Sequence, residues 1–245
     1  MFYNIDKRIL YAVIAIMVIS RIPIFLSNPN SLLALLISIP GILIAITFHE
    51  FAHAKVADKL GDDTPRLQGR LNLNPLSHLD PIGSLMMLFA GFGWGKPVEV
   101  NPRNYDRRFS MDKADAIVSI AGPLMNFFLA IVLTIIYCVI YKVANVNFIN
   151  SQAGIIIMLM INIAISLNIG LGIFNLIPLP PLDGSKIIKA FLPYNARVWF
   201  ENNEKIIEFV FVILWIMGIL SRIISPIIGV VYSALIKGMF AIFGI

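Results

Sequence analysis

The chain has 245 residues, of which 58% are hydrophobic and 13% charged, and its formal net charge is +5 at pH 7. Charged residues make up about a quarter of an average soluble domain, so this composition excludes an ordinary soluble protein and predicts a polytopic membrane protein in a lipid bilayer. The positive charge forms no patch interleaved with aromatic residues, and no glycine loop typical of phosphate binding is present, which argues against a nucleic-acid partner.

Long apolar segments recur along the whole chain, and crossing a bilayer takes about 20 such residues. We predict about five to six transmembrane helices, from the segments 9–26, 32–54, 115–141, 154–177, 206–220 and 223–243. The fold class is therefore an all-α polytopic membrane protein. Residues 1–245 are expected to form a single membrane-embedded domain, with its core at 32–190 and the first and last helices flanking it.

Two stretches between the second and third helices differ from this pattern. Residues 82–92 are apolar but too short to span, so they are expected to re-enter the membrane or to lie within the fold. Residues 70–74 alternate with a period of two, and residues 95–100 follow a glycine-rich turn, so each predicts a strand. Together they predict a small β-hairpin or re-entrant element at the cytoplasmic side.

The second apolar segment ends in a His-Glu-x-x-His pattern, His49 to His53. On a helix the two histidines lie on one face, one turn apart, where both imidazoles can bind one metal ion. Glu50 is placed to reach a metal-bound water, from which it would accept a proton. The chain has only 3 histidines, and two of them stand here, where polar groups are costly and usually functional.

A catalytic zinc site usually has three protein ligands and a fourth position for water. Asp183 is the candidate for the third ligand, because it follows Pro178, Pro180 and Pro181, which cannot continue the preceding helix. Irregular backbone is tolerated at membrane depth only where it is buried in protein or lines a cavity. The alternative is that Asp183-Gly184 forms a simple loop turn.

The distribution of lysine and arginine gives an independent test of this site, since both favour cytoplasmic loops. An N-terminus inside the cell puts most of the 19 basic residues on the cytoplasmic side, with only Lys142 and Arg222 in outer loops. This topology brings Asp183 to the same face as His49 and His53, provided that residues 82–92 do not cross. We therefore expect a multi-pass protein of a prokaryotic cytoplasmic membrane, with its active site near the cytoplasmic face.

Four motifs together resemble the site-2 protease family of intramembrane zinc metalloproteases, peptidase family M50, in its compact prokaryotic form. They are His49-Glu50-Phe51-Ala52-His53, Gly69-Arg70-Leu71-Asn72-Leu73-Asn74-Pro75, Ala121-Gly122-Pro123-Leu124-Met125-Asn126 and Asn175-Leu176-Ile177-Pro178-Leu179-Pro180-Pro181-Leu182-Asp183-Gly184. The resemblance implies a three-helix catalytic core, Zn²⁺ held by His49, His53 and Asp183, and Glu50 as the base. It also implies hydrolysis of peptide bonds within or near transmembrane segments of membrane-protein substrates.

Two further polar residues have competing interpretations. Asn126 follows a Gly-Pro pair in a predicted span, where it could contact the substrate or its oxyanion, or could form an interhelical hydrogen bond. His78 is a third candidate ligand, but Pro75 and Pro81 around it favour a surface turn and ordinary hydrogen bonds.

The alternative function is a metal-ion transporter, or a metal-binding membrane protein, that uses the same histidines and aspartate. Glu50 separates the two, because a transport site does not need a proton-accepting carboxylate between its ligands. The sequence does not identify a natural substrate or an oligomeric state.

Overall fold

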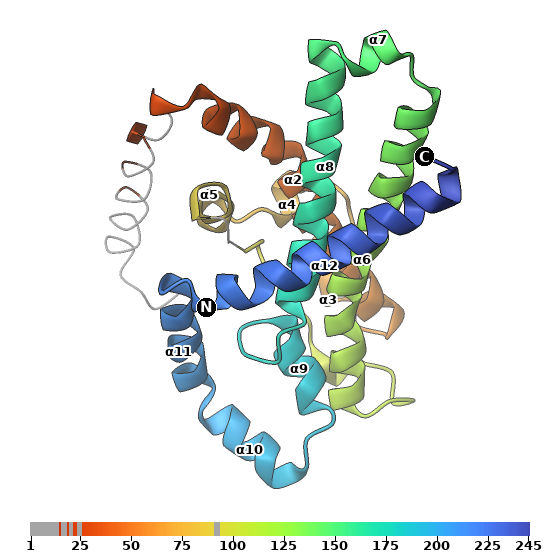
Figure 1. Cartoon of the computed structure of the whole chain (residues 1–245). Coiled ribbons are helices and arrows are strands. Elements are labelled where there is room, and N and C mark those ends of the chain that lie inside the picture. The colour runs from red at the N-terminus through yellow and green to blue at the C-terminus, as the bar shows by residue number, and fades with distance from the viewer. Residues whose placement is uncertain (1–14, 16–18, 20–21, 24–25, 91–93) are drawn as a thin grey trace.

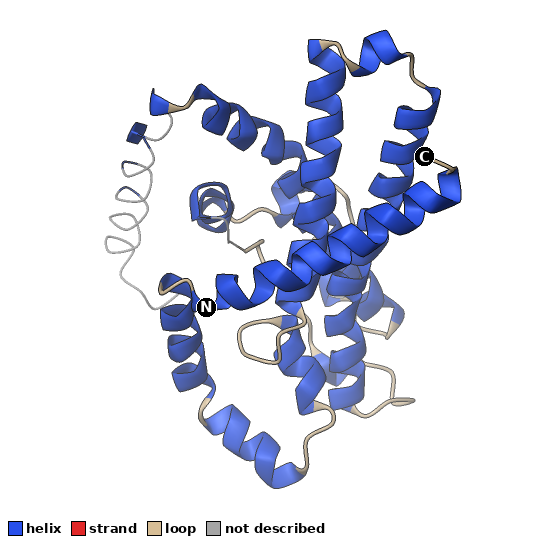
Figure 2. Ribbon diagram, in the orientation of Figure 1, coloured by secondary structure: helices blue, strands red, loops and turns tan. Residues whose placement is uncertain are grey.

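The computed structural model of the chain describes residues 15, 19, 22–23, 26–90 and 94–245. These residues are mostly helical and form no sheet (Figure 2), which confirms the all-α class. The predicted helix 9–26 lies mostly outside the described residues.

Four helices are long and apolar enough to cross a membrane: α2 (Pro29–Lys59), α6 (Met111–Val143), α8 (Gln152–Asn175) and α12 (Ile219–Phe243). The predicted segments 32–54, 115–141 and 223–243 fall entirely inside α2, α6 and α12, and 154–177 runs two residues past the end of α8. The chain is therefore an all-helical membrane protein with these four candidate spans among its described residues.

Helices α2, α6 and α8 pack together as the centre of the molecule. Figure 1 shows α6 and α8 running in opposite directions, joined at one end by the short helix α7 (Val146–Ile149). Buried Ala130 of α6 packs with Ile165 and Ile169 of α8. Helix α12 crosses these two helices (Figure 1), and its apolar side chains pack against the cluster. The three-helix arrangement brings residues from distant parts of the chain to one end of the bundle.

Short helices gather at the end of the bundle where α2 finishes and α6 begins. They are α3 (Thr64–Leu67), α4 (Pro75–His78), the 3₁₀ turn η1 (Pro102–Asn104) and α9 (Asp183–Lys189). Asp62 joins two of these segments, because its buried carboxylate accepts hydrogen bonds from Asn101 N and Asn104 Nδ2 at 2.7 and 3.0 Å. Burial opposes ionisation of Asp62, but these donors and Thr64 hold its pKa below the usual range.

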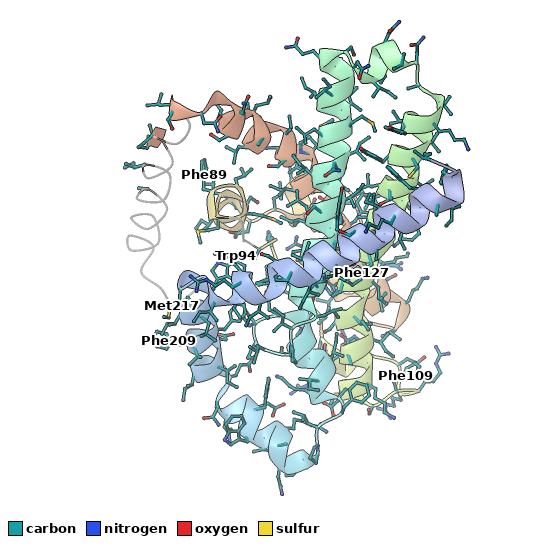
Figure 3. All side chains as sticks on the ribbon, viewed as in Figure 1. Phe89, Trp94, Phe109, Phe127, Phe209 and Met217 are labelled. Atoms are coloured by element: carbon teal, nitrogen blue, oxygen red, sulfur yellow. The ribbon has the colours of Figure 1, made fainter. Side chains whose placement is uncertain are left out.

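The segment 82–92 belongs to α5 (Pro81–Ala90), as far as it is described. A helix of 10 residues is about 15 Å long, half of the hydrocarbon thickness, so the prediction that it does not span is consistent with its length. Trp94 lies directly against α5: a Cβ added at Gly83 would stand 2.1 Å from its carbonyl oxygen. Figure 3 shows Phe89 and Trp94 on opposite sides of this helix.

The predicted strands at 70–74 and 95–100 were wrong. Across the described parts of the chain there is only one isolated antiparallel bridge, between Leu79 and Gly95. Side chains take the place of the expected strand ladder: Asn72 Oδ1 accepts from Asn74 N at 2.7 Å, and Arg70 donates to the carbonyls of Ser77 and Pro97. Asparagine competes with regular structure in this way, and Pro97 within the second segment and Pro75 directly after the first lack an N–H group.

The C-terminal helices divide at a different place from the predicted one. Helix α11 (Glu204–Ile216) ends before Gly218, which adopts a left-handed φ of +71°, so Ser221 and Arg222 lie inside α12 and not between two spans. With 13 residues α11 is about 20 Å long, too short to cross the bilayer upright. It packs through buried Phe211, while Phe209 on the helix and Met217 directly after its end are exposed (Figure 3). It is followed along the chain by α12 and preceded by α10 (Tyr194–Asn202).

Candidate metal centre

His49 and His53 lie one turn apart on the last part of α2, and both are buried. Their Nε2 atoms are 3.0 Å apart. Because the helix continues to Lys59, the two rings are fixed on a regular, well-packed element. The predicted spacing of the histidines thus gives two ring nitrogens that point to one place.

Asp183 is brought to the same place by the break after α8. This helix ends at Asn175, three residues before Pro178, and α9 begins at Asp183 itself. A Cβ added at Gly184 would lie 2.3 Å from the Ile177 carbonyl oxygen, so only glycine allows α9 to start this close to the end of α8. The Asp-Gly pair is therefore a close helix junction, which aims the carboxylate inward.

The three predicted ligands converge, although Asp183 lies more than a hundred residues after the two histidines along the chain. Asp183 Oδ2 is 3.1 Å from His49 Nε2 and 3.2 Å from His53 Nε2. Donor atoms about 2.0–2.2 Å from one tetrahedral zinc ion lie about 3.3–3.6 Å apart, close to these separations. Among the described residues, His49, His53 and Asp183 are the group that could hold a metal ion.

The other nitrogen of each ring is hydrogen-bonded to α6. His49 Nδ1 lies 2.6 Å from Asn126 Oδ1, and His53 Nδ1 lies 2.7 Å from the Val118 carbonyl oxygen. Both oxygens accept, so each Nδ1 carries its proton and each neutral ring presents a lone pair at Nε2. Metal-bound histidines in proteins are usually held in this way.

Three electron-pair donors therefore face one another. Asp183 Oδ2 is buried and receives no hydrogen bond from any described residue. Such an arrangement is repulsive without a cation, and two imidazoles with one carboxylate are a donor set that suits Zn²⁺.

Gly122 of α6 leaves the space that a metal ion would need. A Cβ added to this residue would stand 2.3 Å from His53 Nε2 and 2.7 Å from His49 Nε2, closer than real side-chain contacts. Any larger residue would fill the point on which the ligands converge. The residues present therefore fit a zinc ion.

Glu50, between the two histidines, has its carboxylate against the loop that follows α5. Its Oε2 accepts a hydrogen bond from Val98 N at 3.2 Å. A Cβ added at Gly95 would lie 3.0 Å from Glu50 Oε1, so the backbone of this loop restricts the carboxylate on a second side. The chain thus holds a carboxylate next to the ligands without hydrogen-bonding it to them, as a proton acceptor requires.

The contact at Gly95 gives a test of this placement. We expect Gly95→Ala to lower kcat about a hundredfold while leaving zinc content unchanged, because the new methyl displaces the base and not the ligands. Rates and zinc content of the purified chain check this. Lys96→Ala, a change to an exposed neighbour on the same loop, should be nearly neutral. Full activity of Gly95→Ala would mean that Glu50 is not positioned by this loop.

The remaining candidates have a different environment from the one expected. Asn126 is fully buried and makes its hydrogen bonds inside the protein, which favours the interhelical role over substrate contact. His78 is also fully buried, so its expected place on the surface was wrong; its Nε2 lies 2.7 Å from the Asn72 carbonyl oxygen, an ordinary hydrogen bond. Gly122, Gly95 and Asn168 were missed. For Gly122 a signal existed, since a glycine within a helix often marks a close approach.

Comparisons with known proteins point to one family. The family model for Peptidase family M50 matches residues 140–218. The chain is 37% identical over 219 residues to "Putative zinc metalloprotease YwhC" of Bacillus subtilis, covering 89% of this chain and 97% of the relative. It is 30% identical over 149 residues to "Putative zinc metalloprotease Rip2" of Mycolicibacterium smegmatis, covering 60% and 53%. The Mycobacterium tuberculosis protein of the same name is 27% identical over 193 residues, covering 74% and 70%. No solved structure matches significantly.

Proposed function

Because the chain belongs to peptidase family M50, we propose that His49, His53 and Asp183 are the zinc ligands of its active site. Membership rests on the similarity to YwhC over nearly the full length of both chains. The chain is accordingly an intramembrane zinc metalloprotease. The observation that carries the residue assignment is the convergence of three lone-pair donors, 3.0–3.2 Å apart, around the space left by Gly122.

The chemistry divides between the ion and one side chain. A bound Zn²⁺ would supply Lewis acidity, polarising a carbonyl and making water more acidic. Glu50 takes a proton from the attacking water and later gives it to the leaving amine. The hydrogen bond from Val98 N keeps the Glu50 carboxylate in one orientation before the substrate arrives. Asn126 and Val118 keep the histidine rings turned toward the ion.

The substrate in this proposal is a transmembrane segment of another protein. The two histidines stand on α2, one of the four candidate spans, which supports a substrate that itself lies in the bilayer. A helical substrate must unwind locally, because its carbonyl oxygens are hydrogen-bonded along the helix and the scissile bond is shielded. Cleavage is then expected within or near the apolar segment.

The active site is proposed to face the cytoplasm, in a multi-pass protein of the cell membrane. His53 lies at the end of α2, and basic residues follow it at Lys55, Lys59, Arg66 and Arg70. Lysine and arginine favour the cytoplasmic side. We further propose that residues 1–245 act as one membrane-embedded domain. The similarities give no support to the metal-transporter alternative.

Cleavage by the purified full chain tests this function. In detergent or lipid vesicles, the zinc-loaded protein should cut a model substrate with one transmembrane segment, within or near that segment. A strong chelator should stop the reaction, and added Zn²⁺ should restore it. Cleavage that continues after all zinc has been removed would contradict the proposal. Zinc uptake into vesicles without cleavage would favour a transporter.

A further inference from the structure

Two buried asparagines connect α8 to the metal centre through α6. Asn126 Oδ1 lies 2.6 Å from His49 Nδ1, and Asn126 Nδ2 donates to Asn168 Oδ1 at 3.0 Å. Both asparagine side chains are completely buried. Among the described residues, no hydrogen bond joins Asn168 to a proposed zinc ligand or to Glu50. The reaction described above therefore gives Asn168 no role.

Two backbone carbonyls, which can only accept, determine how both amides are oriented. Asn168 Nδ2 donates to the Ala164 carbonyl at 2.9 Å, which turns Asn168 Oδ1 toward Asn126. Asn126 Nδ2 lies between that oxygen and the Ala45 carbonyl, 3.1 Å away, so it must be the nitrogen end. Asn126 Oδ1 is therefore left to face His49.

The orientation has a direct consequence for the imidazole. An oxygen facing His49 Nδ1 requires the proton on this nitrogen, and the lone pair is then on Nε2, toward Asp183 and His53. A flipped Asn126 amide would present an N–H to Nδ1 and would favour the opposite tautomer, which cannot bind a metal through Nε2. The tautomer of His53 does not depend on an amide, because its Nδ1 donates to the Val118 backbone carbonyl, which can only accept.

We propose that Asn168 is a positioning residue, which locks the Asn126 amide and through it the metal-binding tautomer of His49. The proposal rests on the function given above, in which His49 is a zinc ligand. A purely structural role, as a hydrogen bond between α6 and α8, would change the stability of the helix packing and would leave zinc affinity unchanged. Metal affinity therefore separates the two roles.

The test compares three substitutions at residue 168 in the full chain. Asn168→Leu removes the oxygen that accepts from Asn126, and we expect zinc to bind about 10- to 100-fold more weakly, measured by competition with a chromophoric chelator. At saturating zinc, kcat should fall with KM nearly unchanged. Asn168→Asp should restore both, because a buried, neutral carboxyl keeps the acceptor oxygen and the shape of the amide.

The third substitution, Asn168→Ser, covers the case in which leucine prevents folding. In Asn168→Ser the hydroxyl can bond to the Ala164 carbonyl of its own helix, but it is too short to reach Asn126, so zinc should again bind weakly. Asn162→Leu is the matched control. This residue lies on the same helix and donates to the Tyr232 hydroxyl at 2.6 Å, away from the metal centre, so its loss should leave zinc affinity unchanged.

Each result has one meaning. Wild-type zinc affinity in folded Asn168→Leu or Asn168→Ser would overturn the positioning role, as would equal losses in Asn162→Leu. An aspartate variant that binds zinc as weakly as the leucine variant would also overturn it. If the unaltered chain binds no zinc at all, the proposed function fails first, and this outcome is distinguished from the others by the wild-type measurement.

Discussion

Gly122→Ala is expected to abolish zinc binding while the chain stays folded. The new methyl would stand 2.3 Å from His53 Nε2 and 2.6 Å from His49 Cε1, in the space on which all three ligands converge. Alanine favours a helix more than glycine, so α6 itself should not suffer. We expect zinc affinity to fall by about a hundredfold or more, with cleavage lost in parallel. Zinc content after purification, together with chelator competition, measures the effect.

A second glycine provides the control. Gly238 lies in α12, and a Cβ added there would meet nothing within 4 Å, so Gly238→Ala adds the same methyl to a spanning helix without a clash. Its zinc content and activity should match those of the unaltered chain. Normal zinc binding in Gly122→Ala would show that the ion lies elsewhere.

Glu50→Gln should separate zinc binding from catalysis. Glutamine keeps the size of the side chain and an oxygen that can accept from Val98 N, so the loop over the site should not move. It cannot take a proton from water, and loss of a general base costs about 10²- to 10⁴-fold in rate. We expect zinc content to be retained and kcat to fall by this factor. Cleavage rates at saturating substrate test it.

The matched control makes the same change of charge in the loop that faces Glu50. Glu99 is exposed and accepts a hydrogen bond from Gln68 Nε2 at 2.7 Å, outside the metal centre. Glu99→Gln should therefore cleave at nearly the normal rate. If Glu50→Gln were as active as this control, another group would have to act as the base.

The sequence was sufficient to predict the parts of the site that follow from regular geometry. Two histidines four residues apart in an apolar helix must lie on one face, and α2 places His49 and His53 there. The charge distribution put Asp183 on the same side as these residues, and its carboxylate lies 3.1 Å from His49. The four candidate spans were also predictable, because the length and composition of an apolar segment determine whether it can cross a bilayer.

The features that were missed depend on contacts between distant segments. Alternation over residues 70–74 indicated a strand, but Arg70 and Asn72 bond to backbone groups, and the part of the chain that the structure describes holds no partner strand beside them. The space kept open by Gly122 and the orientation set by Asn168 exist only after α2, α6 and α8 have packed. A single sequence has no periodic signal for such contacts, whereas the turn at Gly218 could have been recognised from the glycine itself.

Diffraction at the zinc absorption edge, from crystals of the zinc-loaded chain, locates the ion among the three proposed ligands. We expect one anomalous peak, within about 2.0–2.2 Å of His49 Nε2, His53 Nε2 and a carboxylate oxygen of Asp183. A peak on other residues, such as His78, or a zinc ion bound without Asp183, would contradict this prediction.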